Sequence, residues 1–196
     1  NEAEIDYNIY YTIRKSRGKW REGNEVGTLY FKDLSRNVNF QRESLDNVFN
    51  FVWGTDSRVI YYTVVDEQLR PHKVLAHTIG TSQHSDLVIF EEEDQSAFVD
   101  ITCTKDKDNF YILTNADNVR NFKLVRAKLE NIGKKYWETI FAVKETEKIE
   151  DVEIFRNFAV LFAKREGLPV IMCYDLWTSE IHQIRLPSKY CVVSPG

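Results

Sequence analysis

A strand–turn–strand pattern occurs three times along the chain, at an interval of about 48 residues. The copies occupy residues 59–79, 110–127 and 158–175, and each joins two apolar runs through a polar turn. A repeat of this length, with four strands per unit, is typical of β-propeller blades. The chain is therefore expected to be all-β, a partial β-propeller of four-stranded antiparallel blades.

Short strands fill most of the chain. It carries 4 Trp, 10 Tyr and 12 Phe, and aromatic and β-branched residues suit a pleated, half-buried surface. Residues 125–136 are interpreted as strand followed by loop rather than as a helix. The predicted strands are near 8–14, 27–32, 48–53, 58–65, 73–78, 86–92, 98–104, 109–114, 121–126, 137–142, 152–155, 158–164, 169–174 and 180–185.

That number of strands makes about three to four blades, so residues 1–196 are predicted to form one propeller segment. Propellers close with roughly four to eight blades. An incomplete ring leaves strand edges open, and open edges pair with other chains. A protein partner at such an edge is one possible use of the chain.

Composition excludes several classes of protein. The net charge of −4 has the wrong sign for a nucleic-acid-binding protein. No apolar run approaches the roughly 20 residues of a membrane span, so no membrane association is predicted. Three cysteines without short spacing, Cys103, Cys173 and Cys191, argue against disulfides or a zinc site and suggest a reducing, cytoplasmic location.

The usual motifs of enzyme chemistry are missing from the sequence. There is no Gly-x-Ser-x-Gly elbow, no P-loop and no dinucleotide-binding fingerprint. The four histidines, His72, His77, His84 and His182, lack the spacing that would place them on one face for a metal. We therefore predict no catalytic, cofactor-binding or metal-ligating residue and no cofactor.

Charged and aromatic residues are given structural interpretations. In the turn 66–71, Asp66 and Glu67 are expected to bond the hairpin backbone, with Arg70 neutralising them. The acidic stretch 91–94 is expected to be a solvated surface segment. The spread of the four tryptophans, at 20, 53, 137 and 177, suggests packing positions between blades.

A family resemblance is carried by several of these stretches. The run Tyr-Tyr-Thr-Val-Val-Asp-Glu-Gln-Leu-Arg-Pro-His-Lys-Val at 61–74 is followed by His-Thr-Ile-Gly-Thr at 77–81. Together with 110–115, 121–126 and 165–168, it resembles the β-propeller region of the prolyl oligopeptidase family of serine peptidases, within the oligopeptidase B and prolyl endopeptidase-like group.

The resemblance implies a seven-bladed propeller that caps a catalytic α/β-hydrolase domain and admits only short peptides to a Ser-Asp-His triad. Cleavage in this family follows proline or basic residues. The catalytic domain is absent from these 196 residues, so no triad residue is carried over and the question of enzymatic activity stays open. The family ordinarily has further strands between Lys107 and Asn109. The alternative is a non-catalytic propeller that binds a protein partner.

Overall fold

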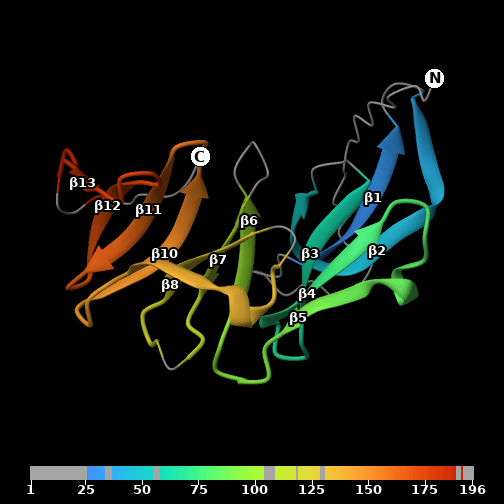
Figure 1. The fold of residues 1–196 in the computed structure, drawn as a ribbon, viewed down its shortest axis with the longest axis horizontal. Helices are drawn as coiled ribbons and strands as arrows, with labels where there is room; N and C mark the ends of the chain where they lie inside the picture. The colour runs from blue at the N-terminus through green and yellow to red at the C-terminus, as the bar shows by residue number, and fades with distance from the viewer. Residues whose placement is uncertain are drawn as a thin grey trace. The chain divides into compact units, whose positions relative to one another are not determined.

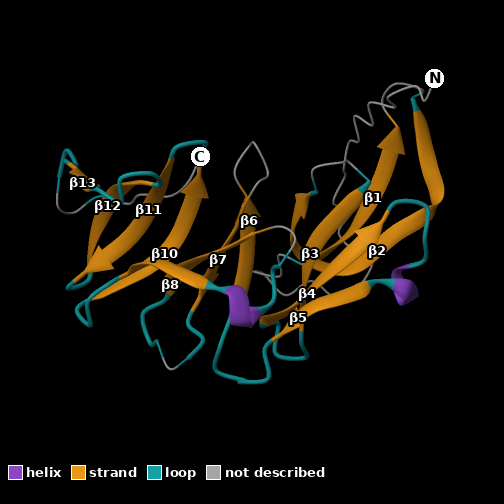
Figure 2. Cartoon of the chain, in the orientation of Figure 1, coloured by secondary structure: helices purple, strands orange, loops and turns teal. Residues whose placement is uncertain are grey.

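The computed structural model describes residues 26–33, 37–54, 58–103, 109–117, 119–128, 131–188 and 191. Antiparallel strands dominate this part of the chain, with two short 3₁₀ segments beside them (Figure 2). The chain divides into two compact units, the first ending at Glu91 and the second beginning at Glu92. No helix in the described residues is long and apolar enough to cross a membrane.

Unit 1 contains a single sheet in the order β1-β2-β3-β4-β5 (Figure 1). Its core includes Leu29, Leu45 and Tyr62, each at most 2% exposed. The 3₁₀ segment η1 (Gln83–Ser85) lies in the connection between the last two strands. The strands are β1 (Gly27–Asp33), β2 (Val38–Trp53), β3 (Val59–Val65), β4 (Pro71–Thr78) and β5 (Leu87–Glu91).

Unit 2 contains two four-stranded sheets, β6-β7-β8-β9 and β10-β11-β12-β13. One apolar cluster joins them, with residues such as Leu113 and Leu124 from the first sheet and Leu161 and Met172 from the second. The strands are β6 (Val99–Cys103), β7 (Asn109–Thr114), β8 (Lys123–Lys128), β9 (Glu138–Ala142), β10 (Glu147–Ile154), β11 (Phe158–Arg165), β12 (Leu168–Asp175) and β13 (Ile181–Ile184).

The three copies of the strand–turn–strand pattern form the hairpins β3–β4, β7–β8 and β11–β12, as the sequence predicts. β7–β8 and β11–β12 pair without interruption across facing apolar residues, for example Ile112 opposite Val125 and Leu161 opposite Met172, whereas β3–β4 has one register shift, between Val64 and Val65. In both sheets of unit 2 the hairpin supplies the two central strands; β1 gives the sheet of unit 1 a fifth strand. The all-β prediction, with antiparallel sheets of a partial propeller, is confirmed.

Strand boundaries differ from prediction in two places. β2 begins at Val38 rather than near 48, because its polar first half pairs with β1, for example Asn39 with Lys32. β10 begins at Glu147 rather than near 152, because Glu147 pairs with Arg165 of β11. Polar residues hide the alternation in both segments. The strand predicted at 8–14 lies outside the described residues.

Residues 125–136 follow the strand-and-loop interpretation. β8 ends at Lys128, and the connection to β9 carries the 3₁₀ segment η2 (Lys134–Tyr136). Buried Ile132 lies in this connection, and its carbonyl accepts a hydrogen bond of 2.8 Å from Nε1 of Trp137. The connection is thereby held to the body of unit 2.

The prediction that the tryptophans occupy packing positions between blades is wrong for Trp177. That side chain is 81% exposed. It lies in the turn after β12, where Oδ1 of Asp175 accepts the backbone N–H groups of Trp177 and Thr178. Trp53 packs against the core of unit 1, and Trp20 lies outside the described residues.

Candidate functional site

The charged turn between β3 and β4 has the structural role predicted for Asp66 and Arg70. Oδ1 of Asp66 accepts the backbone N–H groups of Gln68 and Arg70, and Oδ2 accepts Nε of Arg70 at 2.8 Å. Burial opposes ionisation of Asp66, but the bonds from Arg70 outweigh it and lower its pKa. Glu67 is exposed and takes no part in this bonding, so the prediction is wrong for that residue.

The histidines do not assemble. No group of three or more His, Cys, Asp or Glu side chains within the described ranges could hold a metal ion. His84 and His182 are exposed. Nδ1 of His72 is buried and has no hydrogen-bond partner in the part of the chain that the structure describes. His77, in contrast, lies at the centre of a buried polar cluster in unit 1.

His77 is held between two carboxylates. Its Nδ1 lies 2.8 Å from Oδ1 of Asp86, and its Nε2 lies 3.0 Å from Oε1 of Glu43. Exposure of the three side chains is 0% for His77, 1% for Asp86 and 10% for Glu43. A neutral imidazole donates through one nitrogen only, so the two bonds require an imidazolium or a protonated carboxyl. Phe31 stacks on the ring at 5.7 Å between centroids.

Both carboxylates of this cluster accept a further hydrogen bond. The Tyr62 hydroxyl donates to Oδ2 of Asp86 at 2.7 Å, and the Gly80 N–H donates to Oε1 of Glu43 at 2.6 Å. Burial, and then the bond to Asp86, raise the pKa of Tyr62. The cluster connects β2, β3, β4 and the connection to β5. Since His77 has no exposed surface, the cluster holds these elements together rather than acting on a substrate.

Sequence reasoning missed this cluster. Its members are far apart in the chain: 34 residues separate Glu43 from His77, and 9 separate His77 from Asp86. The available signal was the repeat itself, because His77 occupies a buried position of β4, opposite the buried Ile60 of β3. A histidine at a core position requires polar partners, and the carboxylates are those partners.

The acidic stretch 91–94 is only partly a solvated surface. Glu92 is 6% exposed and accepts a hydrogen bond of 3.1 Å from Nζ of Lys134, contrary to the prediction of a solvated surface segment. Lys134 also bonds Asp117 at 3.0 Å, and Asp117 accepts Nζ of Lys123 at 2.8 Å. Bonds from Lys123 and then Lys134 lower the pKa of Asp117. These ion pairs fix the β7–β8 turn to the β8–β9 connection.

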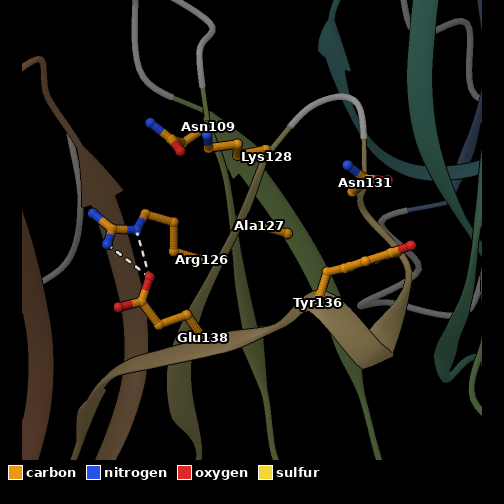
Figure 3. Close-up of a pocket in the computed structure, with 7 residues that line it drawn as sticks. All are labelled: Asn109, Arg126, Ala127, Lys128, Asn131, Tyr136 and Glu138. Carbon is orange, nitrogen blue, oxygen red and sulfur yellow. Dashed lines mark hydrogen bonds and ion pairs between the residues drawn. The ribbon is translucent and has the colours of Figure 1, made fainter.

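A cavity of about 480 Å³ lies in unit 2, at the end of the first sheet where β8 ends and β9 begins. Asn109, Arg126, Lys128 and Glu138 line it from the strands, and Asn131 and Tyr136 line it from the β8–β9 connection. Figure 3 shows Asn109, Lys128 and Arg126 on the same side of β8. The sequence did not predict this pocket, since its lining depends on strand register.

The Arg126 guanidinium is already engaged in the pocket. Its Nε and Nη2 donate to Oε2 of Glu138 at 3.2 and 2.7 Å (Figure 3). The bond to Glu138 is the main reason that the pKa of Arg126 is raised. The side chains of Asn109, Lys128 and Asn131 have no hydrogen-bond or ion-pair partner among the described residues.

The sequence matches the model of one protein family over most of its length. The description is "Prolyl oligopeptidase, N-terminal beta-propeller domain", and the matched residues are 19–108 and 99–195. The chain belongs to this family. The two matched stretches overlap at residues 99–108.

Curated relatives carry peptidase names. "Prolyl endopeptidase-like" of Gallus gallus is 25% identical over 87% of this chain, and its Homo sapiens counterpart is 24% identical over 76%. "Dipeptidyl aminopeptidase BI" of Pseudoxanthomonas mexicana is 25% identical over 74%. The chain spans 29%, 27% and 26% of these three proteins, so it corresponds to less than a third of each.

Solved structures share the fold. Oligopeptidase B from Trypanosoma brucei, with covalently bound antipain, aligns with a TM-score of 0.50 and 18% identity over 85% of this chain and 30% of that chain. TolB from Acinetobacter baumannii aligns with a TM-score of 0.58 and 11% identity, over 89% of this chain and 39% of that chain. At these low sequence identities, the similarity to the two structures shows a shared propeller fold alone.

Proposed function

We propose that this chain is the propeller part of a serine peptidase that acts on short peptides, and that the propeller excludes larger substrates from the catalytic domain. The observation that carries the proposal is the family match, which covers residues 19–108 and 99–195 with the propeller domain of prolyl oligopeptidase. Propellers surround a central channel, and a channel of limited width selects substrates by size.

The site geometry agrees with a supporting rather than a catalytic role. His77 has neighbouring carboxylates, as a catalytic histidine would, but its side chain is 0% exposed and both ring nitrogens are already bonded. A catalytic base must come within hydrogen-bond distance of the proton that it removes. The proposal therefore locates the peptidase triad in a catalytic α/β-hydrolase domain outside these residues, and its expected partners are short peptides in the cytoplasm.

The test uses the full-length polypeptide and a fluorophosphonate probe that labels activated serines. We expect labelling outside residues 1–196, together with hydrolysis of a short fluorogenic peptide that the probe abolishes. Replacing the labelled serine with alanine is the control that should remove both signals. A full-length polypeptide that neither reacts with the probe nor cleaves short peptides would overturn the proposal.

A second candidate function is binding of a protein partner at an open strand edge. Within the described residues β13 pairs only with β12, and Ile181 and Ile184 on it are 47% and 44% exposed. Trp177, in the preceding turn, adds a large exposed aromatic side chain. A partner strand could add to this edge. Labelling by the serine probe distinguishes the two functions, because a purely binding propeller gives none.

A further inference from the structure

The pocket at the end of β8 interrupts an otherwise apolar strand face. Leu113, Leu124 and Phe141 lie side by side on this face and pack in the cluster that joins the two sheets of unit 2. Because side chains alternate along a strand, Arg126 and Lys128 of β8 point to the same face as Leu124. The face thus changes from apolar to charged over two residue positions, and the cavity begins there.

Strand register brings the polar groups together. Asn109 of β7 lies directly opposite Lys128, and Arg126 lies directly opposite Glu138 of β9. Directly opposed residues in an antiparallel pair have neighbouring side chains. Asn131 follows Lys128 closely and its backbone N–H donates to the Lys128 carbonyl at 2.9 Å, but Figure 3 shows its side chain on the opposite side of β8 from Asn109 and Lys128.

The charges of the pocket do not balance. Arg126 and Glu138 neutralise one another, which leaves the Lys128 ammonium without a counter-ion among the described residues. The amide of Asn109, which lies opposite Lys128, is a hydrogen-bond donor without an acceptor in the same part of the chain. One positive charge beside a neutral donor matches the two oxygens of a carboxylate.

We propose that this pocket binds the carboxylate of a short peptide, with the Lys128 ammonium as counter-ion and the Asn109 amide as hydrogen-bond donor. The cavity volume of about 480 Å³ accommodates a few residues. The Tyr136 ring, 48% exposed, lines the pocket on the other side of β8 and offers apolar surface to a further residue of the peptide (Figure 3). The carboxylate belongs to the peptide C-terminus or to an acidic side chain.

The proposal rests on the proposed function only for the choice of a peptide as ligand. The experiment is titration calorimetry at low salt on the purified protein, with any reactive serine blocked by fluorophosphonate. Three acetylated tripeptides are compared: one with a free C-terminal carboxylate, one with a C-terminal amide, and one amide that carries an aspartate side chain. The first and third identify which carboxylate is bound.

We expect a carboxylate-bearing peptide to bind about tenfold or more tightly than the uncharged amide, and Lys128→Gln to remove that difference. Lys144→Gln is the matched control, because Lys144 is an exposed lysine of unit 2 outside the pocket. Equal binding of all three peptides, no binding, or unchanged binding by Lys128→Gln would overturn the proposal. If the serine probe labels the protein but no carboxylate-dependent binding is measured, this inference is wrong and the proposed function still stands.

Discussion

Around His77 each polar side chain contacts another, whereas in the pocket at Lys128 polar donors face a cavity. The buried His77 ring nitrogens both meet carboxylates, at 2.8 and 3.0 Å. The Lys128 ammonium meets none among the described residues. A satisfied buried network stabilises and specifies a fold, but donors left facing a cavity are available for a ligand. We therefore expect the His77 cluster to stabilise unit 1 and the pocket at Lys128 to bind a ligand.

Among the variants that test this comparison, His77→Ala is expected to reduce the free energy of unfolding most. The change leaves the Asp86 and Glu43 carboxylates buried without their partner, and we expect a loss of roughly 3 kcal/mol or more in the free energy of unfolding. His84→Ala is the control, since His84 is exposed. Chemical denaturation measures both variants. A loss for His77→Ala no larger than that of the control would remove the structural role of the cluster.

Arg70→Ala should have the next largest effect. Its side chain is 8% exposed and donates to Asp66, so removal leaves a partly buried carboxylate with one bond fewer. We expect a loss of about 1–3 kcal/mol. Glu67→Ala, in the same turn but exposed, should change stability by less than about 0.5 kcal/mol. Similar melting temperatures for the two variants would contradict the assignment of the turn.

Asp66→Asn tests the same turn through pH. Asparagine still accepts the backbone N–H groups, so the change removes mainly the charge interaction with Arg70. The folded pKa of Asp66 is lowered from 3.8, so its ionisation stabilises the fold above that value, and this contribution is lost as pH falls through the folded pKa. The stability gap between wild type and Asp66→Asn, measured by urea denaturation, should be full at neutral pH and close in acid. A gap independent of pH would contradict the charge interaction.

The smallest expected effect on stability is that of Lys128→Gln. Because the Lys128 ammonium has no partner to lose within the described part of the chain, its replacement should change the unfolding free energy by less than about 0.5 kcal/mol. Thermal denaturation in the absence of peptide measures the change. A large loss would show that Lys128 has a structural role, as His77 does, and the contrast between the two regions would disappear.

The sequence predicted those features of the fold that depend on residues close together along the chain. The hairpins β3–β4, β7–β8 and β11–β12 combine apolar alternation with local turn chemistry, and the Asp66–Arg70 contact lies within four residues. The first half of β2 escaped prediction because its polar residues pair through β1 rather than through an apolar pattern.

The two polar regions depend on residues brought together by the fold, and sequence did not reveal them. Glu43 reaches His77 only because β2, β3 and β4 lie side by side. The pocket exists because register sets Asn109 opposite Lys128 and Arg126 opposite Glu138. Neither register follows from composition, since a shift by one residue would turn every side chain to the other face.

The most direct measurement of the central claim compares two substrates of the full-length polypeptide. One is a short internally quenched peptide, and the other carries the same cleavable sequence in an exposed loop of a folded protein. If this propeller selects by size, kcat/KM for the peptide will far exceed that for the folded protein. Equal values of kcat/KM for the two substrates would contradict the claim.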